Sequence, residues 1–274
     1  MSDSGVVDSD LLVIGAGHLG LRVVLGWRRV FPQARVLAET KSPNRHPELS
    51  RLGAGVRLRD DPSPSPFSNM VVSLPPSAVD DYRREMKRAV RLWSGNGRLV
   101  MISSTAVYAE EDGGLCEEDS PLAVTPRARR LLDAEETIRA AGGIVVRMAG
   151  LYDRHRGPHL VYLRTETSTR RPDGFINLIH YDDAAGLCIA ALRKGELGAT
   201  YVGCDDEPTS RQSMVDAIWS SDVFSPPEGS HRCMFTGKTG PLGRRCQNDQ
   251  TRTLLGWNPR YSRFADWLGL PRDG

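Results

Sequence analysis

Short apolar runs and amphipathic segments alternate along the first half of the chain. The apolar run at residues 11–14 ends at a glycine, and residues 18–30 then place apolar side chains at helical spacing. We therefore expect a strand, a tight turn and a helix in that order. Similar short runs predict further strands at residues 34–39, 56–58, 70–74, 98–103 and 144–148. Amphipathic spacing predicts further helices at residues 78–93 and 126–141.

Strands that alternate with helices in this way are typical of an α/β protein. We expect a Rossmann fold with a doubly wound parallel sheet, whose ligand binds at the carboxyl ends of the strands. Beyond residue 150 the pattern loosens, although a helix is still indicated at residues 181–192 and a strand at residues 200–203. The sequence therefore predicts a single unit over residues 1–274, with a core at residues 10–150 and mainly a small C-terminal substrate lobe at residues 151–274.

The composition is that of an ordinary globular protein. Of the 274 residues, 39% are hydrophobic and 26% are charged, which is enough apolar material for one large α/β domain with an appended lobe. The 36 Lys and Arg residues against 34 Asp and Glu give a formal charge of +2, too small to attract nucleic acid or anionic membranes strongly. The apolar runs are shorter than the roughly 20 residues that span a bilayer. We therefore expect no nucleic-acid and no membrane partner.

The N-terminal segment and the cysteines bear on the cellular compartment. Residues 1–10 are acidic and have neither the basic nor the apolar region of a signal peptide, which favours a cytoplasmic protein. The five cysteines are widely spaced, odd in number and without a CxxC pair. This spacing argues against a disulfide framework and against a zinc site, so we expect free thiols and no bound metal.

A glycine-rich loop follows the first predicted strand. Gly15, Gly17 and Gly20 form the pattern GxGxxG, in which the first glycine permits a tight turn. The second lets the backbone approach a pyrophosphate, and the third lets the helix pack closely on the strand. The helix that starts at His18 and Leu19 presents free N–H groups to the phosphates. Because the loop lies between a strand and a helix, it predicts a nicotinamide dinucleotide site in the core.

The end of the second predicted strand bears on the choice between NAD and NADP. Glu39 has the acidic side chain that can bind the ribose hydroxyls of NAD. It is followed by small polar and basic residues that can instead form a pocket for the 2′-phosphate of NADP. These residues are Thr40, Lys41, Ser42 and Arg45. We expect NADP as the cofactor, with NAD as the alternative. A solvated loop is the competing interpretation of Lys41 and Arg45.

Five segments further along the chain resemble one family. Residues 102–108 read ISSTAVY, residues 117–121 read EEDSP, and residues 146–152 read VRMAGLY. Residues 178–184 read LIHYDDA, and residues 255–259 read LGWNP. In this order they are similar to the SSxxVYG, acidic-Pro, RxxxxYG, IHVDDxA and LGWxP segments of the extended short-chain dehydrogenase/reductase superfamily. The chain thus resembles an atypical member of that superfamily, related to the NAD-dependent epimerases and dehydratases.

The resemblance implies a catalytic role for Ser104, which stands where the family has the serine or threonine that polarises the substrate oxygen. The YxxxK pair that completes the family's active site has no counterpart in this sequence. No tyrosine occurs between Tyr108 and Tyr152, and no lysine occurs between Lys87 and Lys194. The polar residues in this window include Thr125, Arg127, Arg129 and Arg130.

The missing pair matters because of its chemistry. In the family the tyrosine delivers or removes the hydroxyl proton, and the lysine holds the nicotinamide ribose and lowers the pKa of the tyrosine. Threonine is a far weaker acid than a phenol, and arginine stays protonated and cannot relay a proton. Other side chains can supply an acid: Tyr152 is the first candidate, and Tyr181, His180 and His155 are the others. For each of them, packing or local hydrogen bonding is the competing interpretation.

Two classes of function follow from these residues. The first is an NAD(P)-dependent oxidoreductase or epimerase-like enzyme that lacks YxxxK and uses a non-standard acid. The second is a non-catalytic NAD(P)-binding redox sensor, co-regulator or assembly factor. For the enzyme we expect a small-molecule substrate, and a phosphorylated, carboxylated or nucleotide-linked one is indicated by arginines beyond the sixth strand, which equally fit a solvated basic loop. These are Arg154, Arg156, Arg164, Arg170 and Arg171. No oligomeric state is predicted.

Overall fold

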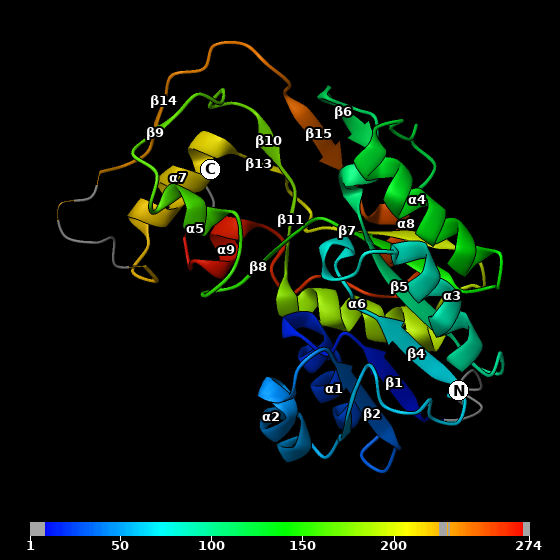
Figure 1. The fold of residues 1–274 in the computed structure, drawn as a ribbon. Coiled ribbons are helices and arrows are strands. Elements are labelled where there is room, and N and C mark those ends of the chain that lie inside the picture. Colours follow the sequence, from blue (N-terminus) through cyan, green and yellow to red (C-terminus); the bar gives the residue numbers. More distant parts are fainter. Residues whose placement is uncertain (1–8, 225–228, 230, 271–274) are drawn as a thin grey trace.

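A seven-stranded parallel sheet forms the centre of the structure (Figure 1). The computed structural model describes residues 9–224, 229 and 231–270, so residues 1–8, where no signal peptide is expected, lie outside the described residues. The strand order is β12-β7-β5-β4-β1-β2-β3. The strands are β1 (Leu11–Ile14), β2 (Val36–Thr40), β3 (Gly55–Leu58), β4 (Asn69–Val72), β5 (Leu99–Ser104), β7 (Ile144–Met148) and β12 (Thr200–Gly203). The predicted α/β Rossmann fold is confirmed.

The strand order changes direction between β1 and β4. Along the chain β2 and β3 are added on one side of β1, whereas β4, β5, β7 and β12 are added on the other, and all neighbouring pairs are parallel. Such a switch point opens a crevice at the carboxyl ends of the strands, where ligands of this class of sheet bind.

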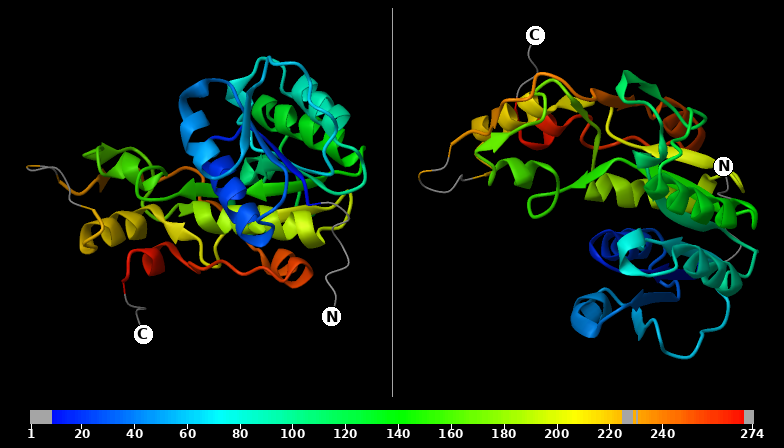
Figure 2. Two further views of the ribbon diagram at one scale, coloured as in Figure 1. Left: turned by 90° about the horizontal axis from the view of Figure 1, so that it is seen from below. Right: turned by 45° about the horizontal axis from the view of Figure 1, so that its top comes forward.

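Helices cover both faces of the sheet, because side chains alternate between the two faces of each strand. Leu11 and Val13 face one apolar layer with α1 and α6, whereas Leu12 and Ile14 face the other with α3 and α4. Figure 2 shows the sheet between these two layers of helices. The helices are α1 (His18–Val30), α3 (Tyr82–Leu92), α4 (Pro126–Arg139) and α6 (Tyr181–Lys194), with the shorter α2 (His46–Arg51) and α8 (Asp249–Leu255).

The predicted boundaries hold best where an apolar run is bounded by glycine or proline. The bounds of β1, α1, β7 and β12 coincide with the predicted ones. The predicted helix at residues 78–93 begins later, because a 3-10 turn at Pro76–Ala78 comes first. Asp81 then caps α3, and its carboxylate accepts the Arg84 N–H at 2.8 Å.

A smaller lobe lies on the left of Figure 1 and has its own apolar cluster, which includes Tyr152, Met214 and Phe264. Its elements are α5 (His159–Tyr162), β9 (Thr167–Ser168), β10 (Phe175–Ile176), β13 (Thr209–Ser210), α7 (Arg211–Ser220), β14 (Met234–Phe235) and α9 (Phe264–Trp267). The sequence-based division at residue 150 placed α6 and β12 beyond the core. In the structure β12 pairs with β7 and α6 packs on α1, so both belong to the core.

Two short strand pairs connect the core with the segments around it. β8 (Gly150–Tyr152) pairs in parallel with β11 (Leu178–His180), and β6 (Asp112–Cys116) pairs in parallel with β15 (Gly243–Cys246). The first pair matters for the site, because it places the loop after β8 beside the start of α6.

The remaining structural features concern thiols, metals and membranes. All five cysteines are buried free thiols. Within the described part of the chain, no group of three His, Cys, Asp or Glu side chains is arranged to hold a metal ion. No helix among the described residues has the length and apolar character needed to cross a bilayer.

Candidate active site

The glycine loop after β1 has the close contacts that the fingerprint requires. Gly15 has φ +80°, and a Cβ there would lie 2.8 Å from the Ser73 carbonyl oxygen. A Cβ on Gly20 would lie 2.8 Å from the Gly15 carbonyl oxygen and 3.0 Å from the Val13 side chain. At Gly17 the nearest atom is 3.9 Å away, so the space beside the backbone is open. The loop therefore fits the pyrophosphate of a dinucleotide.

The first turn of α1 adds N–H groups to this loop. Gly17 is the N-cap of α1 and makes no side-chain capping bond, and His18 and Leu19 open the helix. The first N–H groups of a helix have no intrahelical partner. Together with the partial positive charge of the helix N-terminus, they suit a phosphate group.

One cavity of about 330 Å³ connects the glycine loop with the end of β2. All four residues that the sequence assigned to a 2′-phosphate pocket border it: Thr40, Lys41, Ser42 and Arg45. The Thr40 hydroxyl donates to the Ser42 carbonyl at 2.8 Å and lies 2.8 Å from Nε2 of His46, which fixes the turn. Arg45 pairs with Glu48 at 3.0 Å near the surface.

Glu39 lies apart from this pocket, in a group of charged side chains. Its side chain is only 2% exposed, and both oxygens accept hydrogen bonds from Arg88, with Nη1 at 3.1 Å from Oε2. Nε of Arg57 lies 3.3 Å from the same Oε2. Glu39 borders a neighbouring hollow of about 30 Å³. The carboxylate is therefore bound by two guanidinium groups, which compete with its predicted alternative role of holding ribose hydroxyls.

A second cavity, of about 450 Å³, also borders the glycine loop. Gly17, Ser104, Met148 and Tyr181 are among the residues that line it. Ser104 ends β5, and its hydroxyl oxygen accepts the N–H of Ala106 at 3.2 Å. This bond fixes the hydroxyl and leaves its proton available for a substrate oxygen.

A buried polar cluster supports the strand that carries Ser104. The hydroxyl of Ser103 donates to Glu135 of α4, which is fully buried. Arg147 of β7 is 2% exposed, and its Nη2 lies 2.8 Å from Glu135. Its Nη1 donates to the Glu118 carbonyl at 2.9 Å. The cluster connects β5, β7 and α4 beneath the cavity, and breaking such a buried pair is costly.

The proposed acid Tyr152 lies in the lobe rather than at Ser104. Its ring is fully buried and stands edge-on to His180 and Trp267 at 5.3 and 5.2 Å. Its hydroxyl has no hydrogen-bond partner among the described residues, and burial raises the pKa of Tyr152 well above its usual value. His180 caps α6 by accepting the Asp182 N–H at 3.2 Å. These positions give Tyr152 and His180 no access to the cavity that Ser104 lines.

Two polar residues in the segment between Tyr108 and Tyr152 have structural contacts. Thr125 is the N-cap of α4, and its hydroxyl oxygen accepts the Ala128 N–H at 3.2 Å. Arg130 donates from Nη2 to three carbonyl oxygens in the segment after β4, those of Pro76, Val79 and Asp80. Thr125 therefore caps a helix and Arg130 holds the segment after β4, and both are structural roles.

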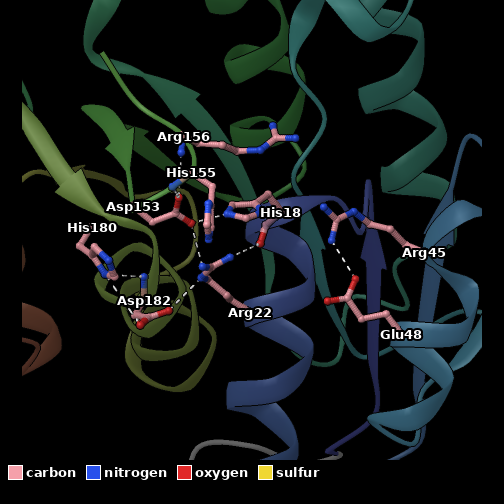
Figure 3. Close-up of polar contacts among 9 residues, drawn as sticks. All are labelled: His18, Arg22, Arg45, Glu48, Asp153, His155, Arg156, His180 and Asp182. Atoms are coloured by element: carbon pink, nitrogen blue, oxygen red, sulfur yellow. Dashed lines mark hydrogen bonds and ion pairs between the residues drawn. The ribbon is translucent and has the colours of Figure 1, made fainter. Parts of the chain in front are cut away.

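The structure brings a histidine and an aspartate together beside the second cavity (Figure 3). Nε2 of His18 is hydrogen-bonded to Oδ2 of Asp153. Asp153 also accepts the Nη2 of Arg22 at 2.8 Å and the main-chain N–H groups of His155 and Arg156 at 2.8 and 2.9 Å. His18 itself lines the cavity with Tyr181, at 4.5 Å between ring centroids.

Sequence reasoning assigned His18 to the cofactor through its backbone and missed Asp153. The two residues are 135 positions apart, so no local pattern connects them. One signal was available: Asp153 follows Tyr152 where the resembling RxxxxYG segment has glycine. A carboxylate in place of this glycine indicates that Asp153 binds another side chain or a ligand. Of the candidate arginines, Arg156 lines the cavity, whereas Arg171 pairs with Asp173 at 2.6 Å.

Comparison with known proteins gives one curated relative and many similar folds. No family model matches the chain. A 3-diazoavenalumate denitrifying reductase of a Streptomyces species is 27% identical over 203 residues, which cover 64% of this chain and 65% of that protein. The chain thus matches slightly less than two thirds of that relative's length.

Among solved structures, a protein of unknown function from Silicibacter pomeroyi DSS has a TM-score of 0.76 and 24% identity, covering 95% of this chain and 96% of that one. The dTDP-glucose 4,6-dehydratase of Bacillus anthracis str. Ames, in complex with NAD, has a TM-score of 0.71 and 14% identity, covering 94% and 96%. At these identities the likeness concerns the fold.

Proposed function

Because the chain has the fold of the extended short-chain dehydrogenase/reductase proteins, among them NAD-dependent epimerases and dehydratases, we propose that it is an NAD(P)H-dependent reductase of a small organic molecule. One observation carries the proposal. The open backbone at Gly17 and the hydroxyl of Ser104 border the same cavity of about 450 Å³. A dinucleotide bound at the glycine loop and a substrate oxygen bound at Ser104 therefore share one space.

The residues of the cavity have distinct tasks in this proposal. A bound reduced nicotinamide supplies a hydride. The Ser104 hydroxyl, fixed by Ala106, donates a hydrogen bond to the substrate and orients the carbon that is reduced. Ile102, Leu131 and Leu151 add apolar wall, which limits water around the reacting atoms.

The pocket at the end of β2 supports NADP as the preferred cofactor. Lys41 and Arg45 border the cavity of about 330 Å³ that begins at the glycine loop, and both are basic. Guanidinium and ammonium groups form strong charge-assisted bonds to phosphate. Glu39, the residue that would favour NAD, is bound to Arg88 and Arg57.

The name of the Streptomyces relative suggests a substrate class. That protein is described as a denitrifying reductase of a diazo compound. We propose small diazo or carbonyl compounds as substrates of this chain. Both reductions consume one hydride and one proton: a carbonyl becomes an alcohol, and a diazo carbon gains two hydrogens with release of N₂. Arg156 on the cavity wall suits a substrate with a carboxylate or a phosphate.

The proposal is tested in two stages. Titration of the purified protein with NADPH and NADH, followed by nicotinamide fluorescence, should give a dissociation constant well below about 1 mM. A screen of diazo compounds, small aldehydes and nucleotide sugars is then followed by loss of nicotinamide absorbance. Ser104→Ala should lower turnover, whereas the control Ser94→Ala, in an exposed turn, should not. Tight binding without turnover across the screen would favour a cofactor-binding sensor instead.

A further inference from the structure

Reduction consumes a proton, and no tyrosine occurs between Tyr108 and Tyr152, where the family resemblance would place the usual donor. We propose that the side chain of His18, oriented by Asp153, is the catalytic group that donates this proton to the substrate. The inference rests on the proposed reductase function. It assigns to His18 a second task beside the phosphate contact expected of its main chain.

His18 has the geometry of a proton donor. It opens α1 and lines the same cavity as Ser104. Nε2 is bonded to Asp153, and in the described part of the chain Nδ1 has no hydrogen-bond partner. The side chain is 17% exposed, so the ring as a whole is neither sealed in the core nor free in bulk solvent. A histidine with one nitrogen on a carboxylate and the other directed to substrate is a recurrent acid–base arrangement.

Asp153 is built to hold the imidazole. Its side chain is 6% exposed and accepts the main-chain N–H groups of His155 and Arg156 as well as the Arg22 guanidinium. Burial raises the pKa of Asp153, but the hydrogen bonds from His18 and the His155 amide outweigh it and keep this pKa below its usual value. The carboxylate therefore stays ionised and stabilises the imidazolium. Asp153 is a positioning residue, since it acts through His18.

The charges around His18 make its protonated form a ready acid. Burial is the largest effect and lowers the pKa of His18; Arg22 and Arg156 lower it further, and Asp153 opposes them. Tyr181 packs edge-on against the ring. Because the pKa lies below its usual value, the imidazolium gives up its proton readily once the substrate has accepted a hydride. It also follows that reduction is faster at lower pH.

The proton and electron balance is simple for both substrate classes. With a carbonyl, the hydride adds to carbon, the C=O π electrons move to oxygen, and the oxygen takes the proton from Nδ1 of His18. With a diazo compound, the diazo carbon takes the proton from His18. The hydride then adds to this carbon as the C–N bond breaks, and N₂ leaves with the bonding electrons. Neutral His18 regains its proton from water.

Tyr181 is the rival donor, because it lines the cavity too. Burial raises the pKa of Tyr181, with Arg156 opposing, so it is a weaker acid than His18 at neutral pH. Tyr181 also has no carboxylate bonded to its hydroxyl among the described residues. The two donors are distinguished by Tyr181→Phe and His18→Gln.

The experiment measures turnover and NADPH affinity of the full chain for His18→Gln, Asp153→Asn, Tyr181→Phe and the exposed control His231→Gln. His18→Gln should lower kcat by about 100-fold or more while the NADPH dissociation constant changes less than about threefold. Asp153→Asn should lower kcat less. In NMR titrations of labelled histidines it should also lower the pKa of His18, because the anion is lost. Tyr181→Phe keeps the ring that packs on His18 and should lower turnover far less than His18→Gln does, whereas His231→Gln should keep parental turnover.

Three results overturn the inference while leaving the reductase intact. The first is parental turnover in His18→Gln. The second is a loss of NADPH affinity in His18→Gln as large as its loss of kcat/KM, which makes His18 a cofactor ligand. The third is loss of turnover in Tyr181→Phe alone. A different result refutes the proposed function itself: the parent protein binds NADPH but reduces no compound in the screen. The proposed role of His18 is then refuted as well.

Discussion

Arg88 of α3 binds both carboxylate oxygens of Glu39 at the end of β2. The two residues are 49 positions apart and join the central sheet to the helix layer beside it. Arg57 of β3 adds a third contact, and Arg88 also pairs with Glu85 at 3.2 Å. The acid at the position that commonly selects NAD is therefore part of a charged cluster that stabilises the fold.

Removing Arg88 should destabilise the protein. Arg88→Met leaves the buried Glu39 with Arg57 alone, and we expect the free energy of unfolding in urea to fall by about 3 kcal/mol. Arg91→Met, an exposed position on the same helix, should change it by less than about 0.5 kcal/mol. The double variant Arg88→Met with Glu39→Gln should regain part of the loss. Equal free energies of unfolding for Arg88→Met and Arg91→Met would show that the charged cluster around Glu39 does not stabilise the fold.

The basic residues after β2 should decide the cofactor. Lys41→Ala combined with Arg45→Ala removes two cations from the pocket. We expect NADPH to bind about tenfold or more weaker and NADH to be unaffected, because only NADPH has the 2′-phosphate. Arg83→Ala with Lys87→Ala removes the same charge from the exposed face of α3 and serves as the control. The phosphate pocket is refuted if NADH affinity falls as much as NADPH affinity.

Two glycines of the loop should respond differently to the same methyl group. Gly20→Ala forces a Cβ to 2.8 Å from a carbonyl oxygen, so it should cost about 1–3 kcal/mol of stability and weaken NADPH binding. Gly17→Ala places its Cβ in open space, with a stability cost below about 1 kcal/mol, yet it occupies the room that a pyrophosphate needs. Thermal unfolding and NADPH titration of both variants test this. Parental affinity in Gly17→Ala would mean that no phosphate approaches this glycine.

Acid should destabilise the lobe through His159. This ring is fully buried, and burial lowers its pKa to about 4, with Asp153 opposing. The unfolded chain binds the proton near pH 6.5, so stability is complete above that pH and falls as the pH drops toward 4. The loss amounts to about 3 kcal/mol.

His159→Leu keeps the site apolar and removes this titration. Urea unfolding between pH 4 and 7.5 should therefore show a smaller decline for His159→Leu than for the parent protein. The comparison is made as a difference between the two proteins, because burial also lowers the pKa of His18 and His180. Identical declines in the two proteins would contradict the assignment to His159.

Local patterns predicted the core because each of its elements carries its own signal. The run at residues 11–14 is fully buried in β1, and residues 18–30 form α1 with the amphipathic spacing that the sequence shows. The prediction of Ser104 as a site residue rests on a contiguous segment in the same way, and the structure places this serine on the cavity wall. The sequence predicted fewer elements of the lobe. Its helix α7 mixes polar and apolar residues, and the lobe strands β9, β10, β13 and β14 have two residues each.

The contacts that matter most for the site depend on the tertiary fold. His18 and Asp153 meet because β8 pairs with β11 and brings the following loop to the start of α1 and α6. Tyr152, one residue earlier, points into the lobe, so the side chain that looked suitable by type lies on the wrong side of its strand. The alternation of side chains along a strand shows which residues share a face, but which face borders the cavity is known only from the tertiary structure.

The neighbouring serines at the end of β5 make different contacts, and this has a consequence for surveys of variants. Both residues border the cavity, but the Ser103 hydroxyl donates to the buried Glu135, whereas the Ser104 hydroxyl accepts only the Ala106 N–H in the part of the chain that the structure describes. In a saturation survey that scores both cellular abundance and turnover, substitutions at Ser103 should reduce abundance first. Substitutions at Ser104 should leave abundance intact and reduce turnover per molecule. Two identical letters in a row would thus give two different phenotypes.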